Sequence, residues 1–126
     1  MPASAKLVLA LGALFGAGGV ALGAFGAHAL KARLVADQLA LWSTATQYLF
    51  WHALGVLAVG LAAVSLPEST WLRAAGALLT GGILLFSGSL YLLAFGAPKA
   101  LGAVTPFGGL AFIAGWAALL AGVLRA

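Results

Sequence analysis

Four long stretches without a charged side chain constrain this sequence more than any other feature. They cover residues 7–30, 38–67, 74–98 and 100–124. Each is longer than the roughly 20 residues that an α-helix needs to cross a hydrocarbon core about 30 Å thick. The eight charged side chains lie outside these stretches: Lys6, Lys31, Arg33, Asp37, Glu68, Arg73, Lys99 and Arg125. The pattern predicts an integral membrane protein with four transmembrane helices.

Composition supports this class and excludes several others. Of the 126 residues, 64 % are hydrophobic and 6 % are charged, which is too little charge to cover the surface of a soluble domain. The net charge of +4 comes from single basic residues between the apolar stretches, where they anchor helix ends, so no nucleic-acid partner is expected. Cysteine is absent, which excludes disulfides and thiolate ligands. We expect one domain, residues 1–126.

The expected spans are roughly residues 5–27, 44–66, 70–95 and 106–124. Their connections are short, so neighbouring helices must be antiparallel. The predicted fold is an all-α membrane protein, an up-down-up-down antiparallel four-helix transmembrane bundle. Residues 28–43 are expected to form a short interfacial segment, in which a helix starts near Val35–Asp37. Ser69 or Thr70 is the expected N-cap of the third span, and Thr105 that of the fourth.

The side of the membrane that holds the first and third connections is called side A below. Basic residues divide three against three between the two sides, so the positive-inside rule does not decide the orientation. The amino terminus adds a small bias toward cytoplasmic termini. The first span resembles a signal peptide that ends in an Ala27-His28-Ala29 site, but its apolar run is too long for one. We therefore expect a retained first span.

Two glycine stripes predict close helix packing. In membranes, small residues let helix backbones approach, and packing replaces the hydrophobic driving force. Glycines in the first stripe are alternately four and three residues apart, and glycines in the second stripe are seven residues apart. These stripes are expected to be packing seams, within the chain or between copies. Their members are Gly12, Gly16, Gly19, Gly23 and Gly26 in the first span, and Gly108, Gly115 and Gly122 in the fourth.

Most of the polar side chains within the spans fall in the half of the bundle near side A. Buried polar groups in lipid need partners, which inward faces provide. We therefore predict one polar cluster there, in which His52 hydrogen-bonds Tyr91 or Ser87. The cluster either serves packing alone or binds a ligand. Its expected members are His28, Gln47, Tyr48, His52, Ser87, Ser89, Tyr91 and Thr105.

The same residues argue against a metal, a cofactor or catalysis. Neither histidine has a second potential ligand three or four residues away, and no carboxylate lies within a span. A nucleophilic triad lacks an acid to orient its base, and a proton-coupled pump lacks an intramembrane Asp or Glu. We expect no metal, no cofactor and no enzymatic activity.

Five sequence blocks resemble the YgdD/YwdK-like family of small four-span membrane proteins, the family of domain of unknown function 423. The blocks are GAFGAH at 23–28, TATQYLFWHALG at 44–55, FSGSLY at 86–91, TPFGG at 105–109 and AGW at 114–116. The resemblance covers nearly the whole chain. It implies a multi-pass protein of the inner membrane with cytoplasmic termini, and it implies no catalytic residues.

The preferred functional hypothesis is a small bundle that binds a lipid, an amphiphile or a partner helix through the polar cluster. Its partners would be membrane lipids, a second copy of the chain or another membrane protein. An alternative is a component of an oligomeric small transporter or channel. A third is a cofactor-binding or enzymatic membrane protein.

Overall fold

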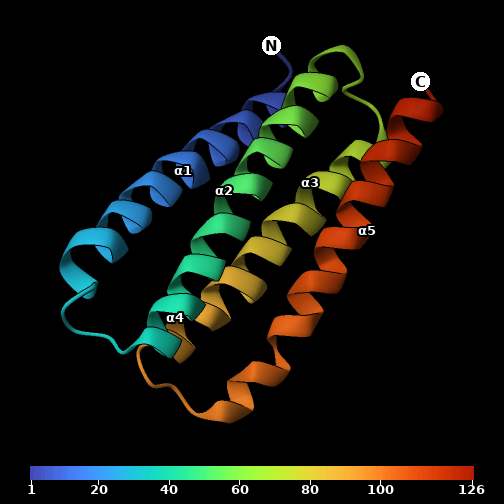
Figure 1. The fold of residues 1–126 in the computed structure, drawn as a ribbon. Helices are drawn as coiled ribbons and strands as arrows, with labels where there is room; N and C mark the ends of the chain where they lie inside the picture. The colour runs from blue at the N-terminus through green and yellow to red at the C-terminus, as the bar shows by residue number, and fades with distance from the viewer.

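The structure, a computed structural model, describes all residues from 1 to 126 as helices and short connections (Figure 1). Four helical segments are long and apolar enough to cross a membrane, which confirms the predicted fold class. The first consists of α1 (Ala3–Phe25) and the π-turn η1 (Gly26–Leu30), and the second is α2 (Ala36–Ser65). The third joins α3 (Thr70–Gly82), the π-turn η2 (Ile83–Ser87) and α4 (Gly88–Ala94). The fourth joins the 3₁₀ turn η3 (Lys99–Ala103) to α5 (Thr105–Leu124).

Successive spans run in opposite directions, and both termini lie at the same end (Figure 1). Helix α2 starts at Ala36, as expected from the Val35–Asp37 region. Its 30 residues extend about 45 Å at 1.5 Å per residue, well beyond a hydrocarbon core of about 30 Å. The first turns of α2 therefore belong to the side A interface, or the helix tilts to stay within the membrane.

The ends of the helices follow local chemistry. The Leu72 amide donates to Ser69 Oγ at 3.2 Å, so Ser69 caps α3 as predicted. Gly96, with φ of +92°, reverses the chain after α4, a conformation that favours glycine. The predicted cap at Thr105 is wrong, since Val104 precedes α5 and already has helical dihedral angles. The 3₁₀ turn η3 leads directly into α5, which removes the need for a side-chain cap.

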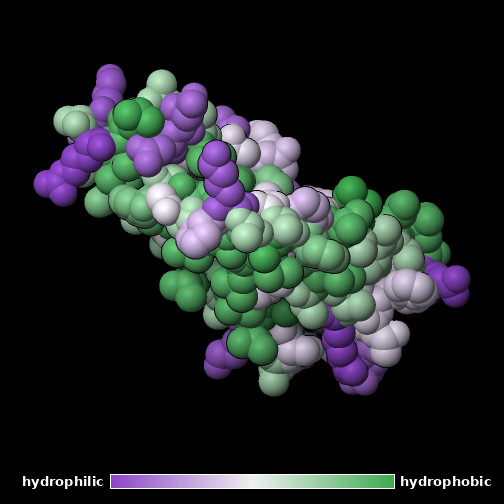
Figure 2. All heavy atoms as spheres, turned by 90° about the horizontal axis from the view of Figure 1, so that it is seen from below, coloured by the Kyte–Doolittle hydropathy of each residue, from purple (hydrophilic) through white to green (hydrophobic).

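The helices form an open array in which α1 and α5 are the outer members. Helix α1 packs almost entirely on α2, and α5 packs mainly on α3 and η2 (Figure 1). Val56, Val59, Leu72 and Leu79 are fully buried and form the centre of the core. Seen from side A, hydrophobic residues cover much of the molecule, and hydrophilic side chains stand in scattered groups (Figure 2). The outer helices therefore offer much of their surface to lipid.

Candidate functional site

The polar side chains predicted to form one cluster lie in several separate places. His28, on η1, and Gln47, on α2, are both exposed. The remaining six make local contacts in three different groups, described in turn below. The structure therefore does not bring these eight residues together around one cavity.

The first group links α1, α2 and α4 through Trp42 and Thr46, which the sequence analysis did not single out. The Thr46 hydroxyl donates to the Trp42 carbonyl at 2.9 Å. Its single proton is thereby used, so the Tyr91 hydroxyl is the donor in the 2.7 Å bond between Tyr91 and Thr46. Trp42 Nε1 donates to the Leu22 carbonyl on α1 at 2.9 Å. The Trp42 ring is buried, and its centroid lies 4.4 Å from that of Tyr91.

The second group consists of hydroxyls that pair with backbone or with each other. Ser87 Oγ donates to the Ala45 carbonyl at 2.8 Å and joins η2 to α2. Ser89 Oγ donates to the Phe86 carbonyl, so Thr105 donates to Ser89 at 2.6 Å and joins α5 to α4. These hydroxyls have protein partners and form structural ties between helices.

The third group contains His52 and Tyr48 and corrects the most specific prediction. His52 is buried, but its Nδ1 pairs with the Tyr48 carbonyl of its own helix at 2.7 Å, and it bonds neither Tyr91 nor Ser87. The predicted register was wrong. Since Ser87 lies beside Ala45 and the helices are antiparallel, His52 lies two helical turns beyond the level of Ser87. Its ring stacks instead on Phe112 of α5, with the centroids 3.6 Å apart.

The glycine stripes contact their neighbours unequally. A Cβ placed on Gly12 or Gly115 would lie 2.7 Å from the side chain of Leu57 or Leu79, respectively. Gly19, Gly26, Gly108 and Gly122 also face atoms of the neighbouring helix that leave little or no room for a Cβ. Gly16 faces open space, and Gly23 faces only the methyl group of Thr46 at 3.4 Å. Positions 12, 19 and 26 thus form the contact line of α1, and Gly23 lies beside it.

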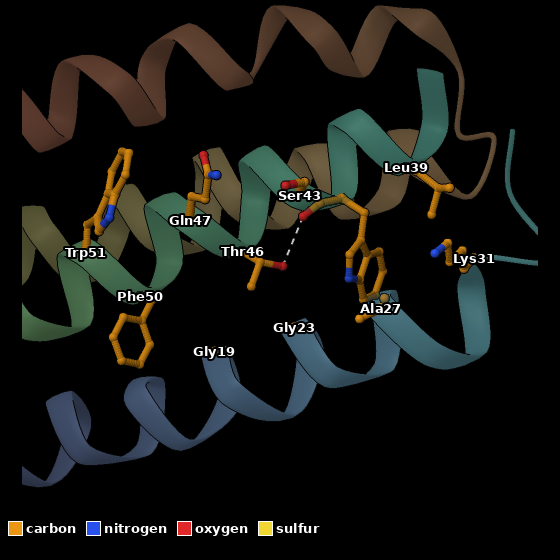
Figure 3. A pocket seen from close by; sticks show the side chains of 12 residues that line it. Gly19, Gly23, Ala27, Lys31, Leu39, Ser43, Thr46, Gln47, Phe50 and Trp51 are labelled. Atoms are coloured by element: carbon orange, nitrogen blue, oxygen red, sulfur yellow. Dashed lines mark hydrogen bonds between the residues drawn. The ribbon is translucent and has the colours of Figure 1, made fainter. Parts of the chain in front are cut away.

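A groove of about 630 Å³ opens beside this contact line, between α1 and α2. The lining residues on α1 and η1 are glycines and Ala27, so this part of the wall carries no side chain larger than a methyl group. Thr46 and Phe50 point from α2 toward α1, and Gln47 and Trp51 lie along the other edge of α2, at the rim (Figure 3). The lining consists of Gly19, Gly23, Gly26, Ala27 and Lys31 on one side, and Leu39, Trp42, Ser43, Thr46, Gln47, Phe50 and Trp51 on the other.

The groove changes in character along its length. Lys31 stands at its side A end, on the turn that follows η1, and makes no ion pair. Ser43, Thr46 and Gln47 supply polar groups further along α2, and Phe50 and Trp51 supply exposed aromatic surface beyond them. Among the lining residues, only Gln47 and the three glycines Gly19, Gly23 and Gly26 were predicted from the sequence to belong to the polar cluster or to a packing seam. The four-residue steps Trp42-Thr46-Phe50 and Ser43-Gln47-Trp51 carried the signal that would have found the α2 wall.

No three side chains of the types that ligate metals come together in the structure. The one ion pair, Arg73 with Glu68 at 3.4 Å, lies on the exposed connection between α2 and α3. Most polar groups of the spans thus serve helix contacts or line grooves, and Thr80 Oγ1 is buried without a partner.

Four antiparallel apolar helices, tied by hydroxyl and indole hydrogen bonds, define a small multi-pass integral membrane protein. The family model described as protein of unknown function (DUF423) matches residues 22–109, and the chain belongs to this family. The resemblance identified from the sequence blocks is thereby confirmed.

Several named relatives cover nearly the whole chain. It is 44 % identical to a UPF0382 membrane protein of Staphylococcus saprophyticus, over 95 % of this chain and 98 % of that protein. It is 41 % identical to the UPF0382 membrane protein YwdK of Bacillus subtilis, over 95 % of this chain and 98 % of that protein. It is 38 % identical to the UPF0382 inner membrane protein YgdD of Escherichia coli, over 97 % of this chain and 92 % of that protein. No solved structure matches the chain.

Proposed function

We propose that the groove between α1 and α2 binds an anionic phospholipid from the side A leaflet. The observation that carries this proposal is the order of chemistry along the groove. From side A toward the membrane centre, the lining begins with a cation, passes Leu39 and Trp42, and continues with hydrogen-bonding groups and then exposed aromatic surface. A phospholipid presents its phosphate, glycerol esters and acyl chains in the same order.

Lys31 is the group suited to the phosphate. Its side chain is exposed at the end of the groove and has no acidic partner. A basic side chain near an anionic membrane surface contributes about 1 kcal/mol to lipid attraction. This corresponds to roughly a fivefold preference for an anionic over a zwitterionic headgroup.

Ser43 and Gln47 are suited to the glycerol esters. Both are exposed on α2 at positions one helical turn apart, and neither side chain has a hydrogen-bond partner in the protein. Polar groups within the membrane are costly unless they are paired. The hydroxyl and amide N–H groups can donate to ester carbonyls, which are acceptors only.

The glycines of α1 are suited to an acyl chain. Gly19 and Gly23 leave the α1 wall flat, and Phe50 covers Gly19 at the deep end of the groove. An acyl chain lying on this backbone contacts Phe50, and Trp51 borders the groove at its rim. With cytoplasmic termini, the orientation that we propose from the family resemblance, the bound lipid would belong to the outer leaflet.

Native mass spectrometry tests this function. The protein is reconstituted with equal amounts of phosphatidylglycerol and phosphatidylethanolamine, and retained lipid is counted after gentle activation. We expect retention of phosphatidylglycerol, a roughly fivefold loss of its preference in Lys31→Gln, and loss of the lipid in Gly23→Leu, which fills the groove.

Two matched variants serve as controls. Lys99→Gln removes a cation on the same side of the membrane but outside the groove, and Gly16→Leu adds the same bulk where α1 faces open space. Both should retain the lipid like the wild-type protein. Equal retention of the two lipids by the wild-type protein, or equal losses in the Lys31 and Lys99 variants, would refute the proposal.

A further inference from the structure

A second groove, of about 580 Å³, lies between α2, η2 and α5 and shares no residue with the groove described above. Its walls are mainly aromatic. The residues that matter here are Tyr48 and His52 of α2, Phe86 of η2, and Phe112, Ile113 and Trp116 of α5. Ile113 and Trp116 are exposed, so the groove opens toward lipid.

His52 supplies an unpaired polar atom at this groove. The side chain is only 6 % exposed, and its Nδ1 lies 2.7 Å from the Tyr48 carbonyl. A carbonyl oxygen only accepts, so Nδ1 carries the proton and the neutral ring has its lone pair on Nε2. Nε2 has no protein partner. The only fully buried side-chain polar atom without a partner is Thr80 Oγ1, so Nε2 keeps some accessible surface, on a side chain that lines the groove.

The surrounding rings define the shape of a matching ligand. His52 stacks on Phe112 with an interplanar angle of 13°. The Trp116 ring lies edge-on to the His52 ring, with the two ring centroids 5.8 Å apart. Tyr48 and Phe86 form the other wall, with their centroids 4.5 Å apart. Aromatic walls favour a flat ring that can stack or pack edge-to-face. His52 lies about 24 Å along α2 from Ala36, so the ligand must be soluble in the membrane.

We propose that this groove binds the hydroxylated aromatic head of a membrane-soluble compound, such as a hydroquinone, whose O–H donates to His52 Nε2. A ketone or an ester has no hydrogen to donate, so its oxygen lone pairs would repel the lone pair on Nε2. An ammonium group would have to lose its hydration without a carboxylate partner, which is costly in lipid. The paired requirement for an O–H donor and a flat ring therefore selects a phenolic compound.

The test uses decylhydroquinone and its di-O-methyl ether as paired probes. The ether has the same ring and tail but no O–H donor. Binding to the full-length protein in nanodiscs is measured by quenching of tryptophan fluorescence, and ¹⁵N-histidine NMR reports hydrogen bonding at Nε2. The His28→Gln variant assigns the two histidines. We expect the hydroquinone to bind about fivefold or more tightly than the ether, as one hydrogen bond of roughly 1 kcal/mol allows, and to shift the Nε2 resonance.

The variant His52→Phe keeps an aromatic ring on Phe112 and removes both nitrogens. If it folds, as judged by thermal unfolding in detergent, it should bind both probes with equal affinity. If it does not fold, the NMR measurement on the wild-type protein decides alone. Equal binding of the two probes by the wild-type protein, or an Nε2 resonance that the hydroquinone leaves unchanged, would overturn the proposal.

Discussion

At the scale of single residues, Thr46 is the junction of the polar contacts near side A. It donates to the Trp42 carbonyl and accepts from Tyr91, so one hydroxyl connects α2 to α4 while its own helix holds it in place. Hydrogen bonds between membrane helices are each worth about 0.5–1 kcal/mol, because the unfolded chain in the membrane also finds partners.

Tyr91→Phe is therefore expected to lower the free energy of unfolding by about 0.5–1 kcal/mol. It removes the donor to Thr46 and leaves the ring packed on Trp42. The matched control is Tyr48→Phe, since no protein group bonds the Tyr48 hydroxyl, and it should change stability little. Unfolding in a mixed-micelle denaturant titration measures both. Equal losses in the two variants would rule out the Thr46–Tyr91 bond as the source.

The sequence identified many of the polar residues but few of their partners. Ser87, Ser89, Tyr91 and Thr105 were predicted to be paired because an unpaired hydroxyl is costly in lipid, and each has a partner. Which partner each takes depends on helix register to within one residue. No local pattern sets that register, and the prediction for His52 failed for this reason.

At the scale of helices, glycine positions and π-turns determine how closely α5 approaches the third span. Gly108 lies against the backbone of Phe86, and Gly82 lies against the ring of Phe112. Both contacts occur at or next to η2, where the helix widens. The spans themselves were predictable because length and hydropathy suffice to define them. The π-turns were not, since they result from the fit between helices rather than from local preference.

Gly108→Ala should destabilise the protein by about 1–3 kcal/mol or more, because the added methyl group meets backbone atoms of Phe86 that cannot rotate away. Gly16→Ala is the matched control at a helical glycine with open space around it. It should be neutral or stabilising by up to about 1 kcal/mol, since alanine favours helix. Thermal unfolding in detergent compares them. A Gly16→Ala variant as unstable as Gly108→Ala would contradict this assignment.

At the scale of the whole molecule, the open array explains why the candidate site lies at the edge of the protein. Helix α1 contributes few buried residues, namely Ala5, Gly12 and Gly19. It therefore packs on α2 along a narrow line and leaves a groove beside that line. The glycine spacing predicted that α1 packs closely on a neighbouring helix. The spacing could not show that Gly23 lines a groove and is not packed against that helix.

The position of a bound lipid tests the proposed function most directly. A phosphatidylglycerol that carries a photoactivatable diazirine beside its glycerol esters is incorporated into nanodiscs with the protein, and cross-linked residues are mapped by mass spectrometry. We expect labelling to concentrate between residues 39 and 51 and between 19 and 31, and to fall sharply in Gly23→Leu. Labelling spread evenly over the lipid-facing surfaces of all four spans, or unchanged in Gly23→Leu, would contradict a lipid site between α1 and α2.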